Sequence, residues 1–252
     1  MPETYTIAKV DELNHAFLQA SPMEVLRWSM ETFAEKIAIC SAFGPEGIIL
    51  LHMLSLLGRP FKLFTLDTGR LHQETHELMH QCEQRYDIKI DVYAPDPDDV
   101  HRIVREHGIN LFYQSVELRE LCCEVRKVRP MLRALEGLSA WITGLRRIQT
   151  VTRHAVAKVE IDSAHKGIIK VNPLADWSEQ EVWDYIGAHN LAYNSLHDRG
   201  YRSIGCAPCT RATHPGEDIR AGRWSWEKSD RKECGIHVTS SSQFDKNGVS
   251  EG

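Results

Sequence analysis

Residues 36–57, KIAICSAFGPEGIILLHMLSLL, hold the pattern that decides the fold class. The short apolar run at 36–40 is typical of a buried strand, and the run at 48–57 is long enough for a helix. Between them lies a turn, residues 41–47, with two glycines and a proline. A strand, a turn and a helix in this order predict the first unit of an α/β fold.

The same alternation continues along the chain. Further strands are expected at residues 61–66, 88–93, 141–143, 155–161 and 166–171, and further helices at 22–35, 71–86, 98–107, 115–136 and 178–189. Ser21 is the expected N-cap of the first of these helices, and a capping box at Ser178 opens the last. We therefore expect an α/β protein with one doubly wound parallel sheet that helices cover on both faces.

Composition and charge exclude several classes of protein. The apolar run near residues 48–57 is interrupted by His52 and Ser55, so no membrane span is predicted. Residues 1–17 lack the basic start and apolar stretch of a secretory signal, so we expect a cytoplasmic protein with reduced thiols. The net charge of −5 argues against a nucleic-acid partner.

The C-terminal part of the sequence differs from the rest. Beyond Asn194 the periodicity is lost and Gly, Pro, Arg and Trp become frequent, so something other than a large core must organise this segment. The last residues are polar, as is typical of disorder. We expect one domain over residues 1–225 and a mobile segment over 226–252 that carries Cys234 and is disordered after about residue 238.

Four of the seven cysteines form two close pairs. Cys122 and Cys123 are adjacent on a predicted helix, whereas Cys206 and Cys209 lie in a loop. Successive helix residues point about 100° apart, so neighbouring thiolates diverge. An iron–sulfur cluster offers each cysteine its own iron and suits this divergence better than one zinc ion does. The alternative is two small core residues and a redox dithiol.

Cys234 stands apart, in the stretch RKECGIH at residues 231–237. Its cationic neighbours favour the thiolate, which is the nucleophilic form. Gly235 gives the backbone freedom, and His237 lies three residues further on. A mobile chain end can carry a thiol to a bound substrate and then to a reducing partner. The local sequence alone leaves open that Cys234 is an exposed cysteine with no role.

Three turns that follow predicted strands are expected to meet at the carboxyl edge of the sheet, where α/β folds bind ligands. The first turn precedes a helix, whose free N–H groups and dipole favour a phosphate. Arg126 and Lys127 follow the cysteine pair at a spacing of four, which predicts a cation beside each thiolate. The turns contribute Ser41, Phe43, Gly44, Thr68, Gly69, Arg70, Gly144, Arg146 and Arg147 to an expected anion pocket.

Together these motifs resemble the assimilatory sulfonucleotide reductases, specifically the thioredoxin-dependent bacterial adenylyl-sulfate (APS) reductases. The matching stretches are SAFGPEG (41–47), TLDTGRLHQET (65–75), CCEVRKVRP (122–130), WITGLRRIQTVTR (141–153), KVNPLADWSEQEVW (170–183), IGCAPCTRATHPGEDIRAGRW (204–224) and KECGIH (232–237). The chain departs from the family in three places. Ile148 replaces an acidic residue, the stretch to Arg153 is one residue short, and Ser225 breaks a tryptophan run.

The resemblance implies an adenine nucleotide alpha hydrolase-like fold and one [4Fe–4S] cluster on Cys122, Cys123, Cys206 and Cys209. It also implies a catalytic nucleophile at Cys234, assisted by Lys127 and His237. The 41–47 turn, Leu66 and Gly144 would hold adenine and ribose. Phosphate and sulfate would meet Lys127, Arg153, Arg220, Arg223 and His237. A homo-oligomer is expected as well.

The implied reaction begins when the Cys234 thiolate attacks the sulfur of APS and expels AMP. Thioredoxin or glutaredoxin would then release sulfite from the S-sulfonated cysteine. One alternative is the 3′-phosphorylated nucleotide PAPS, alone or beside APS, although relatives devoted to PAPS typically lack the four cluster cysteines. An ATP-cleaving adenylyl transferase would need a Ser-Gly-Gly-x-Asp-Ser loop instead of SAFGPEG. A nucleotide sensor would have no use for Cys234.

Overall fold

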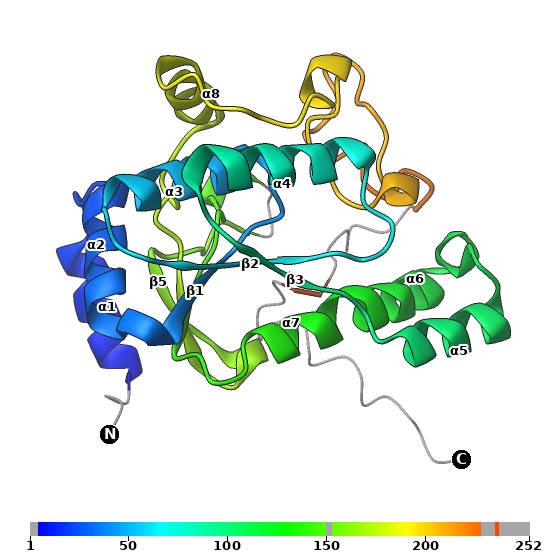
Figure 1. Ribbon diagram of the computed structural model, residues 1–252, viewed down its shortest axis with the longest axis horizontal. Helices are drawn as coiled ribbons and strands as arrows, with labels where there is room; N and C mark the ends of the chain where they lie inside the picture. The colour runs from blue at the N-terminus through cyan, green and yellow to red at the C-terminus, as the bar shows by residue number, and fades with distance from the viewer. Residues whose placement is uncertain (1–4, 150–152, 228–234, 237–252) are drawn as a thin grey trace.

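The fold is built on a sheet whose strands alternate with helices along the chain (Figure 1). The computed structural model describes residues 5–149, 153–227 and 235–236. Its main elements are α1 Ile7–Ala16, α2 Pro22–Phe33, β1 Ile37–Cys40, α3 Pro45–Leu56, β2 Lys62–Leu66, α4 Gln73–Tyr86, β3 Ile90–Tyr93, α5 Pro97–His107, α6 Val116–Cys123, a π-helix Glu124–Val128, α7 Arg129–Ala134, β4 Ala140–Ile142, β5 Val159–Asp162, β6 Ile168–Val171 and α8 Glu179–Ala188.

The strand order in the sheet is β3-β2-β1-β4-β6-β5. β1 pairs in parallel with both β2 and β4, so the chain winds outward in two directions from β1. The predicted doubly wound α/β class is confirmed. The edge strand β5, however, runs antiparallel to β6. Only five residues, 163–167, connect these two strands, and a parallel crossover needs about a dozen.

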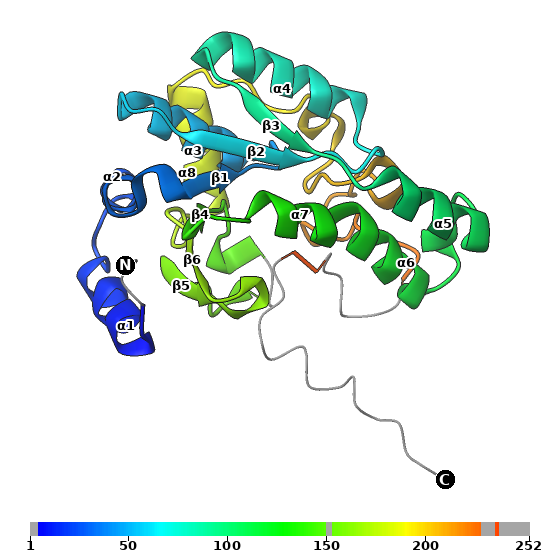
Figure 2. The ribbon, with the colours of Figure 1, turned by 60° about the horizontal axis from the view of Figure 1, so that its bottom comes forward.

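Helices cover both faces of the sheet (Figure 2). Ile37 and Ile39 of β1 point into the larger core, which they share with the apolar residues of α3 and α4. Ala38 points to the opposite face and packs in a smaller cluster with Met131 of α7. This alternation follows from the two-residue period of a strand. It explains why the β1 run is apolar without interruption.

A separate, smaller core joins segments that are about a hundred residues apart. It contains Ile103 of α5, Phe112, Cys122 of α6, Cys206 and Trp224. The segment 194–227, which the sequence marks as rich in loops, is thus held against α5 and α6 largely through its own cysteines and Trp224. Two backbone hydrogen bonds, Arg211 N to Gly222 O (3.0 Å) and Trp224 N to Cys209 O (3.1 Å), close the loop on itself.

The edge of the sheet at β5 is covered by α1, a helix that the sequence analysis did not predict. The Asn14 side chain replaces a neighbouring strand. It donates to Val159 O (2.8 Å) and accepts from Val159 N (3.0 Å). An exposed strand edge invites pairing with other chains, and this amide pairs part of it.

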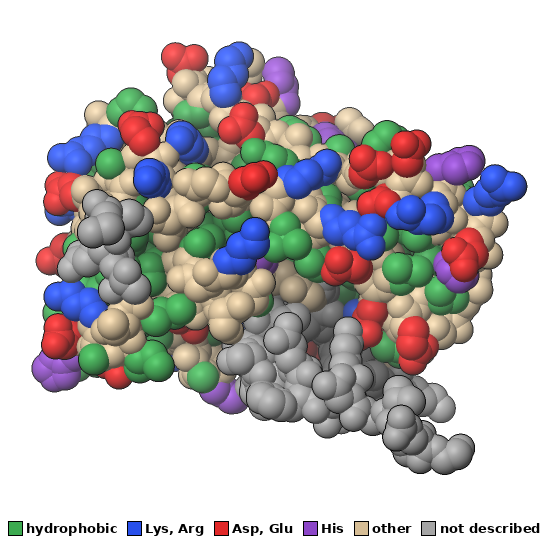
Figure 3. Space-filling view, turned by 90° about the horizontal axis from the view of Figure 1, so that it is seen from below, with side chains coloured by type: hydrophobic (Ala, Val, Ile, Leu, Met, Phe, Trp, Pro, Cys, Tyr) green, Lys and Arg blue, Asp and Glu red, His purple; other side chains and the backbone are tan. Residues whose placement is uncertain are grey.

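The described helices and one face of the molecule were compared with what a membrane span or a polyanion track requires. None of the described helices is long and apolar enough to cross a membrane. Figure 3 shows Lys and Arg side chains interspersed with Asp and Glu over one face, without a large patch of a single sign. On that face, no track for a polyanion is apparent.

Candidate active site

A cavity of about 280 Å³ lies at the carboxyl ends of β1, β2 and β4. The three loops that follow these strands line it, together with α8, residues 202–205 and residues 219–223. This is the crevice beside the point where the strand order reverses, the usual ligand site of an open α/β sheet. The expected ligand contacts that line it are Ser41, Gly44, Leu66, Thr68, Lys127, Gly144, Arg146, Arg153, Arg220 and Arg223.

The loop after β1 is folded tightly against the start of α3. Ser41 is buried, and its hydroxyl accepts a hydrogen bond from Phe43 N (3.1 Å). A Cβ on Gly47 would lie 2.4 Å from Ser41 Oγ, so only glycine allows this approach. Gly44 is the N-cap of α3 and Pro45 its first helical residue. The positive end of the α3 dipole therefore faces the cavity.

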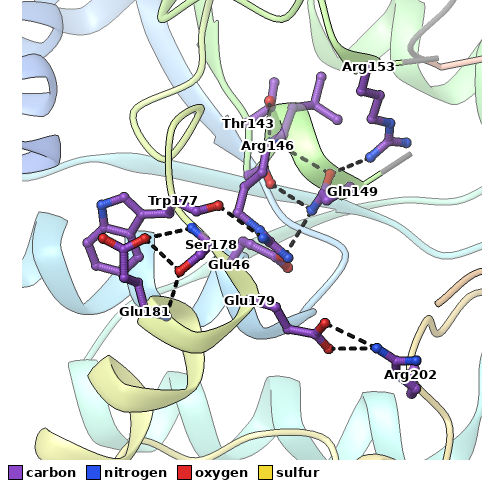
Figure 4. Close-up of polar contacts among 12 residues, drawn as sticks. Glu46, Thr143, Arg146, Gln149, Arg153, Trp177, Ser178, Glu179, Glu181 and Arg202 are labelled. Carbon is purple, nitrogen blue, oxygen red and sulfur yellow. Dashed lines mark hydrogen bonds and ion pairs between the residues drawn. The ribbon is translucent and has the colours of Figure 1, made fainter. Parts of the chain in front are cut away.

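Glu46 and Gln149 organise the cationic side chains on one wall of the cavity (Figure 4). Glu46 Oε1 accepts hydrogen bonds from Arg146 Nε (2.8 Å) and Gln149 Nε2 (2.9 Å). Gln149 Oε1 in turn accepts from Arg146 N (3.2 Å) and from Arg153 Nη1 (2.5 Å). Gln149 thus joins Arg153 to the carboxylate in the first turn of α3. Sequence reasoning named neither Glu46 nor Gln149, although both lie in the stretches that match the family.

Among the described residues, four of the expected ligand contacts do not line this cavity. Phe43 is a core residue with a left-handed backbone (φ 55°). Arg147 turns away from its neighbour Arg146. It donates to Val156 O (2.7 Å) and pairs with Asp176. Gly69 and Arg70 belong to the turn after β2, and Arg70 lines a second pocket instead.

The second pocket brings the four paired cysteines together. It is lined by Cys122, Cys123, Cys206 and Cys209, by the cations Arg70, Arg119, Arg126 and Lys127, and by Phe112 and Pro208. The first two cysteines are at the C-terminal end of α6. The other two belong to a short 3₁₀ turn that a backbone hydrogen bond from Ala207 N to Arg70 O (2.8 Å) attaches to the turn after β2.

The two pockets are neighbours that share one side chain. Lys127 lines both. Thr68 lines the larger cavity, while its hydroxyl lies 3.2 Å from Cys206 Sγ and its carbonyl accepts from Arg126 Nη1 (2.7 Å). The turn after β2 therefore connects the anion-binding loops to the cysteines.

The cations beside the cysteines stand on a π-helix, which the sequence analysis treated as ordinary α-helix. Residues 124–128 follow Cys123 directly and contain Arg126 and Lys127. Such π segments are rare in proteins, and those that occur often lie at functional sites. The buried Nε of Arg126 has no hydrogen-bond partner in the described part of the chain. An anionic sulfur in the adjoining pocket would be a suitable acceptor for the Arg126 Nε–H group.

Burial dominates the acidity of the Cys122 and Cys209 thiols. It raises the pKa of Cys209 to about 12, with a further increase from Cys206, against the opposing effect of Lys127. Burial likewise raises the pKa of Cys122, which Arg126 lowers in part. Both thiols are therefore neutral at pH 7. A metal centre that binds these sulfurs would displace the protons and balance the negative charge of the thiolates.

The described residues contain no group of three or more His, Cys, Asp and Glu side chains arranged to hold a single metal ion. The four cysteines share the walls of one pocket instead. Cys234 and His237, expected to act on substrate, lie outside the described residues. Of the residues between them, Ile236 lines the larger cavity, which the sequence analysis did not anticipate.

The sequence is similar to that of known proteins over most of its length. Residues 36–212 match the phosphoadenosine phosphosulfate reductase domain. An adenosine 5′-phosphosulfate reductase of Burkholderia cepacia is 51% identical over 205 residues, which are 81% of this chain and 82% of that protein.

Solved structures extend the comparison to the fold. The phosphoadenylyl-sulfate reductase of Candida auris, a phosphate complex, superposes with a TM-score of 0.73 at 31% identity, covering 84% of this chain and all of that one. The FMN adenylyltransferase of Candida glabrata has a TM-score of 0.55 at 13% identity, covering 82% and 74%, and shows a shared fold alone.

Proposed function

Because the chain belongs to the phosphoadenosine phosphosulfate reductase domain family, we propose that it reduces adenosine 5′-phosphosulfate to sulfite and AMP. It is an oxidoreductase of assimilatory sulfate reduction. The observation that carries this proposal is that Lys127 lines two adjoining sites, a cavity at the switch point of the sheet and a pocket of four cysteines. The cavity would hold the sulfonucleotide. The cations around the cysteine pocket provide the positive environment that favours thiolate chemistry next to the bound nucleotide.

We propose that the nucleotide lies in the larger cavity with its anionic end toward Lys127, Arg153, Arg220 and Arg223. Leu66, Gly144 and the loop at Ser41 would receive adenine and ribose. Cationic side chains at the anionic end offset the repulsion between a substrate anion and an approaching thiolate. Arg146 differs from these four side chains, because the Glu46 carboxylate already neutralises its charge. Its role is to hold the wall of the cavity in position.

We propose that Cys122, Cys123, Cys206 and Cys209 bind one [4Fe–4S] cluster. Their common pocket and its four surrounding cations fit a buried anionic iron–sulfur group, as does Arg126 Nε, which has no hydrogen-bond partner among the described residues. When bound, the cluster supplies electrostatic and structural support beside the reaction centre. Lys127, which lines both pockets, is the residue that would transmit its influence to the substrate.

In the proposed chemistry the Cys234 thiolate attacks the sulfur of APS. A sulfur–sulfur bond forms, the sulfur–oxygen bond of the anhydride breaks, and AMP leaves with that electron pair. One thiolate of a dithiol protein, thioredoxin or glutaredoxin, then attacks Cys234 Sγ and releases sulfite. Its second thiol resolves the mixed disulfide, so the partner loses two electrons and two protons per sulfite. We propose that this takes place in a reducing compartment, the cytoplasm, in a homo-oligomer.

The decisive experiment is incubation of purified protein with APS in the absence of any dithiol, followed by intact mass measurement. An added sulfonate group on wild-type protein, absent from Cys234→Ser, is expected. A Cys234→Ser protein that still releases sulfite when thioredoxin is added would contradict the proposal. Iron and sulfide analysis of protein purified without oxygen tests the cluster separately, with Cys209→Ser as the variant expected to lose it.

PAPS remains the alternative substrate, since the matching family is named for it and the Candida auris relative is a phosphoadenylyl-sulfate reductase. The two are separated by comparing kcat/KM for APS and PAPS on the same preparation. We expect APS to be preferred, because the four cysteines accompany APS use.

A further inference from the structure

We propose that Ile236 is the apolar anchor that docks the Cys234-bearing segment at the rim of the nucleotide cavity. This inference rests on the proposed function, which makes Cys234 the nucleophile. It adds a positioning residue to that reaction. Its basis is the place of Gly235 and Ile236 in the structure.

The Ile236 side chain packs against apolar residues of the sheet and of α7. It is partly buried against the cluster formed by Phe64 of β2, Met131 of α7 and Trp141 of β4. The same side chain lines the nucleotide cavity, as do Cys40 and Leu66 at the carboxyl ends of β1 and β2. Ile236 therefore bridges the hydrophobic interior and the ligand site. A residue in that position removes apolar surface from water only when the segment is docked.

Gly235 supports the same docked position from the other side. Its φ of +81° lies in the left-handed region, which glycine occupies without strain. A Cβ there would lie 3.3 Å from Val128 Cγ2, a tight contact. Val128 follows Lys127, the residue that lines both pockets. The two docking residues thus lie between the cation-bearing π-helix and the ends of the strands.

The position of Ile236 limits the position of Cys234, because the two residues are only two apart in the chain. Two residues of extended chain span at most about 7 Å, so seating Ile236 confines Cys234 to the neighbourhood of the cavity. Confinement of a nucleophile near its target raises the rate of attack without a new contact to the substrate. A weak apolar anchor also permits release, which the second half-reaction with a dithiol protein requires.

The test measures the rate at which Cys234 becomes sulfonated by saturating APS in a single turnover, by rapid quench and intact mass. Ile236→Ala is expected to slow this step about tenfold, because it removes most of the apolar contact. Ile236→Leu should restore most of the rate. Gly235→Ala, a second variant, should also slow the step. AMP affinity, measured by calorimetry, should stay within twofold of wild type in all three.

Ile109→Ala is the matched control, since Ile109 is 64% exposed and lines neither pocket. An Ile236→Ala protein that is sulfonated at the wild-type rate overturns the anchor. So does a loss of AMP affinity as large as the loss of rate, because Ile236 would then act as a nucleotide contact. Failure of the wild-type protein to form any adduct would instead contradict the proposed function.

Discussion

Arg119 and Glu227 form a buried, two-point ion pair. Arg119 Nε lies 2.9 Å from Glu227 Oε1, and Nη2 lies 3.1 Å from Oε2, with the two side chains 1% and 3% exposed. The Arg119 guanidinium also stands 4.9 Å from the centre of the Trp224 ring. The pair fastens the loop that carries Cys206 and Cys209 to α6, which carries the other two cysteines.

Glu227→Ala is expected to lower the free energy of unfolding by about 3–5 kcal/mol, because it removes the buried carboxylate that bonds twice to the Arg119 guanidinium and leaves the more distant, exposed Glu120 carboxylate (3.9 Å). Urea unfolding monitored by circular dichroism measures the loss. The double variant Arg119→Met/Glu227→Leu should recover most of it, since it buries no charge. Glu31→Ala provides the control: it breaks an exposed pair with Arg59, and a change above about 1 kcal/mol there would contradict the role of burial.

Gln149→Ala is expected to weaken AMP binding about tenfold, roughly the value of a hydrogen bond to a charged group. The change frees Arg153 from the amide that joins it to Glu46. Adenosine, which has no phosphate for Arg153 to meet, should bind as before. Calorimetry with both ligands distinguishes the cases. Gln180→Ala, on the exposed side of α8, is the matched control. Equal losses for AMP and adenosine would argue against a role through Arg153.

Gly144→Ala should reduce both stability and AMP affinity. A Cβ at this position would lie 2.8 Å from Glu46 Cβ and 3.5 Å from Gly47 N, so the loop after β4 must move away from the first turn of α3. Overpacking of this kind costs about 1–3 kcal/mol. Gly187→Ala on α8 meets nothing within 4 Å and should stabilise the protein by about 0.5–1 kcal/mol. Thermal unfolding of both variants, with AMP titrations, checks the contrast.

Stability is expected to fall as the pH drops below neutrality. Burial lowers the pKa of His52, His72 and His197, so the folded protein binds protons less readily than the unfolded chain at these sites. The contribution of these histidines to folding stability is complete above the ordinary histidine pKa of about 6.5. It is lost as the pH falls through their lowered pKa values in the folded protein. Urea midpoints at pH 7.5 and 5.5 measure the effect. His197→Gln should reduce the difference, and an unchanged difference would remove His197 from the explanation.

The sequence predicts most of the elements because local signals agree with the tertiary structure. Ser21 and Ser178 form complete capping boxes, and α2 and α8 begin directly after them. The exceptions depend on distant contacts. α1 is held at the sheet edge through Asn14 and Val159, 145 residues apart. The π-helix after Cys123 has no signal in the local sequence.

The candidate site shows the same division. The turns that line the cavity are visible as motifs, because a strand, a turn and a helix have a local signature. The directions of individual side chains are not. Arg146 and Arg147 are neighbours in one turn, but Glu46 draws the first to the cavity and Asp176 draws the second away. Such partners are remote in the chain, so no local pattern distinguishes the two arginines.

The split construction of the cysteine pocket has a consequence for biosynthesis. Ribosomes deliver a chain from its N-terminus, and domains fold as their segments emerge. Cys122 and Cys123 leave the ribosome more than eighty residues ahead of Cys206 and Cys209. The pocket therefore closes only when translation is nearly finished. Any metal centre on these four thiols must be loaded late, and a truncated chain that has already formed β1 to β6 would be unable to hold it.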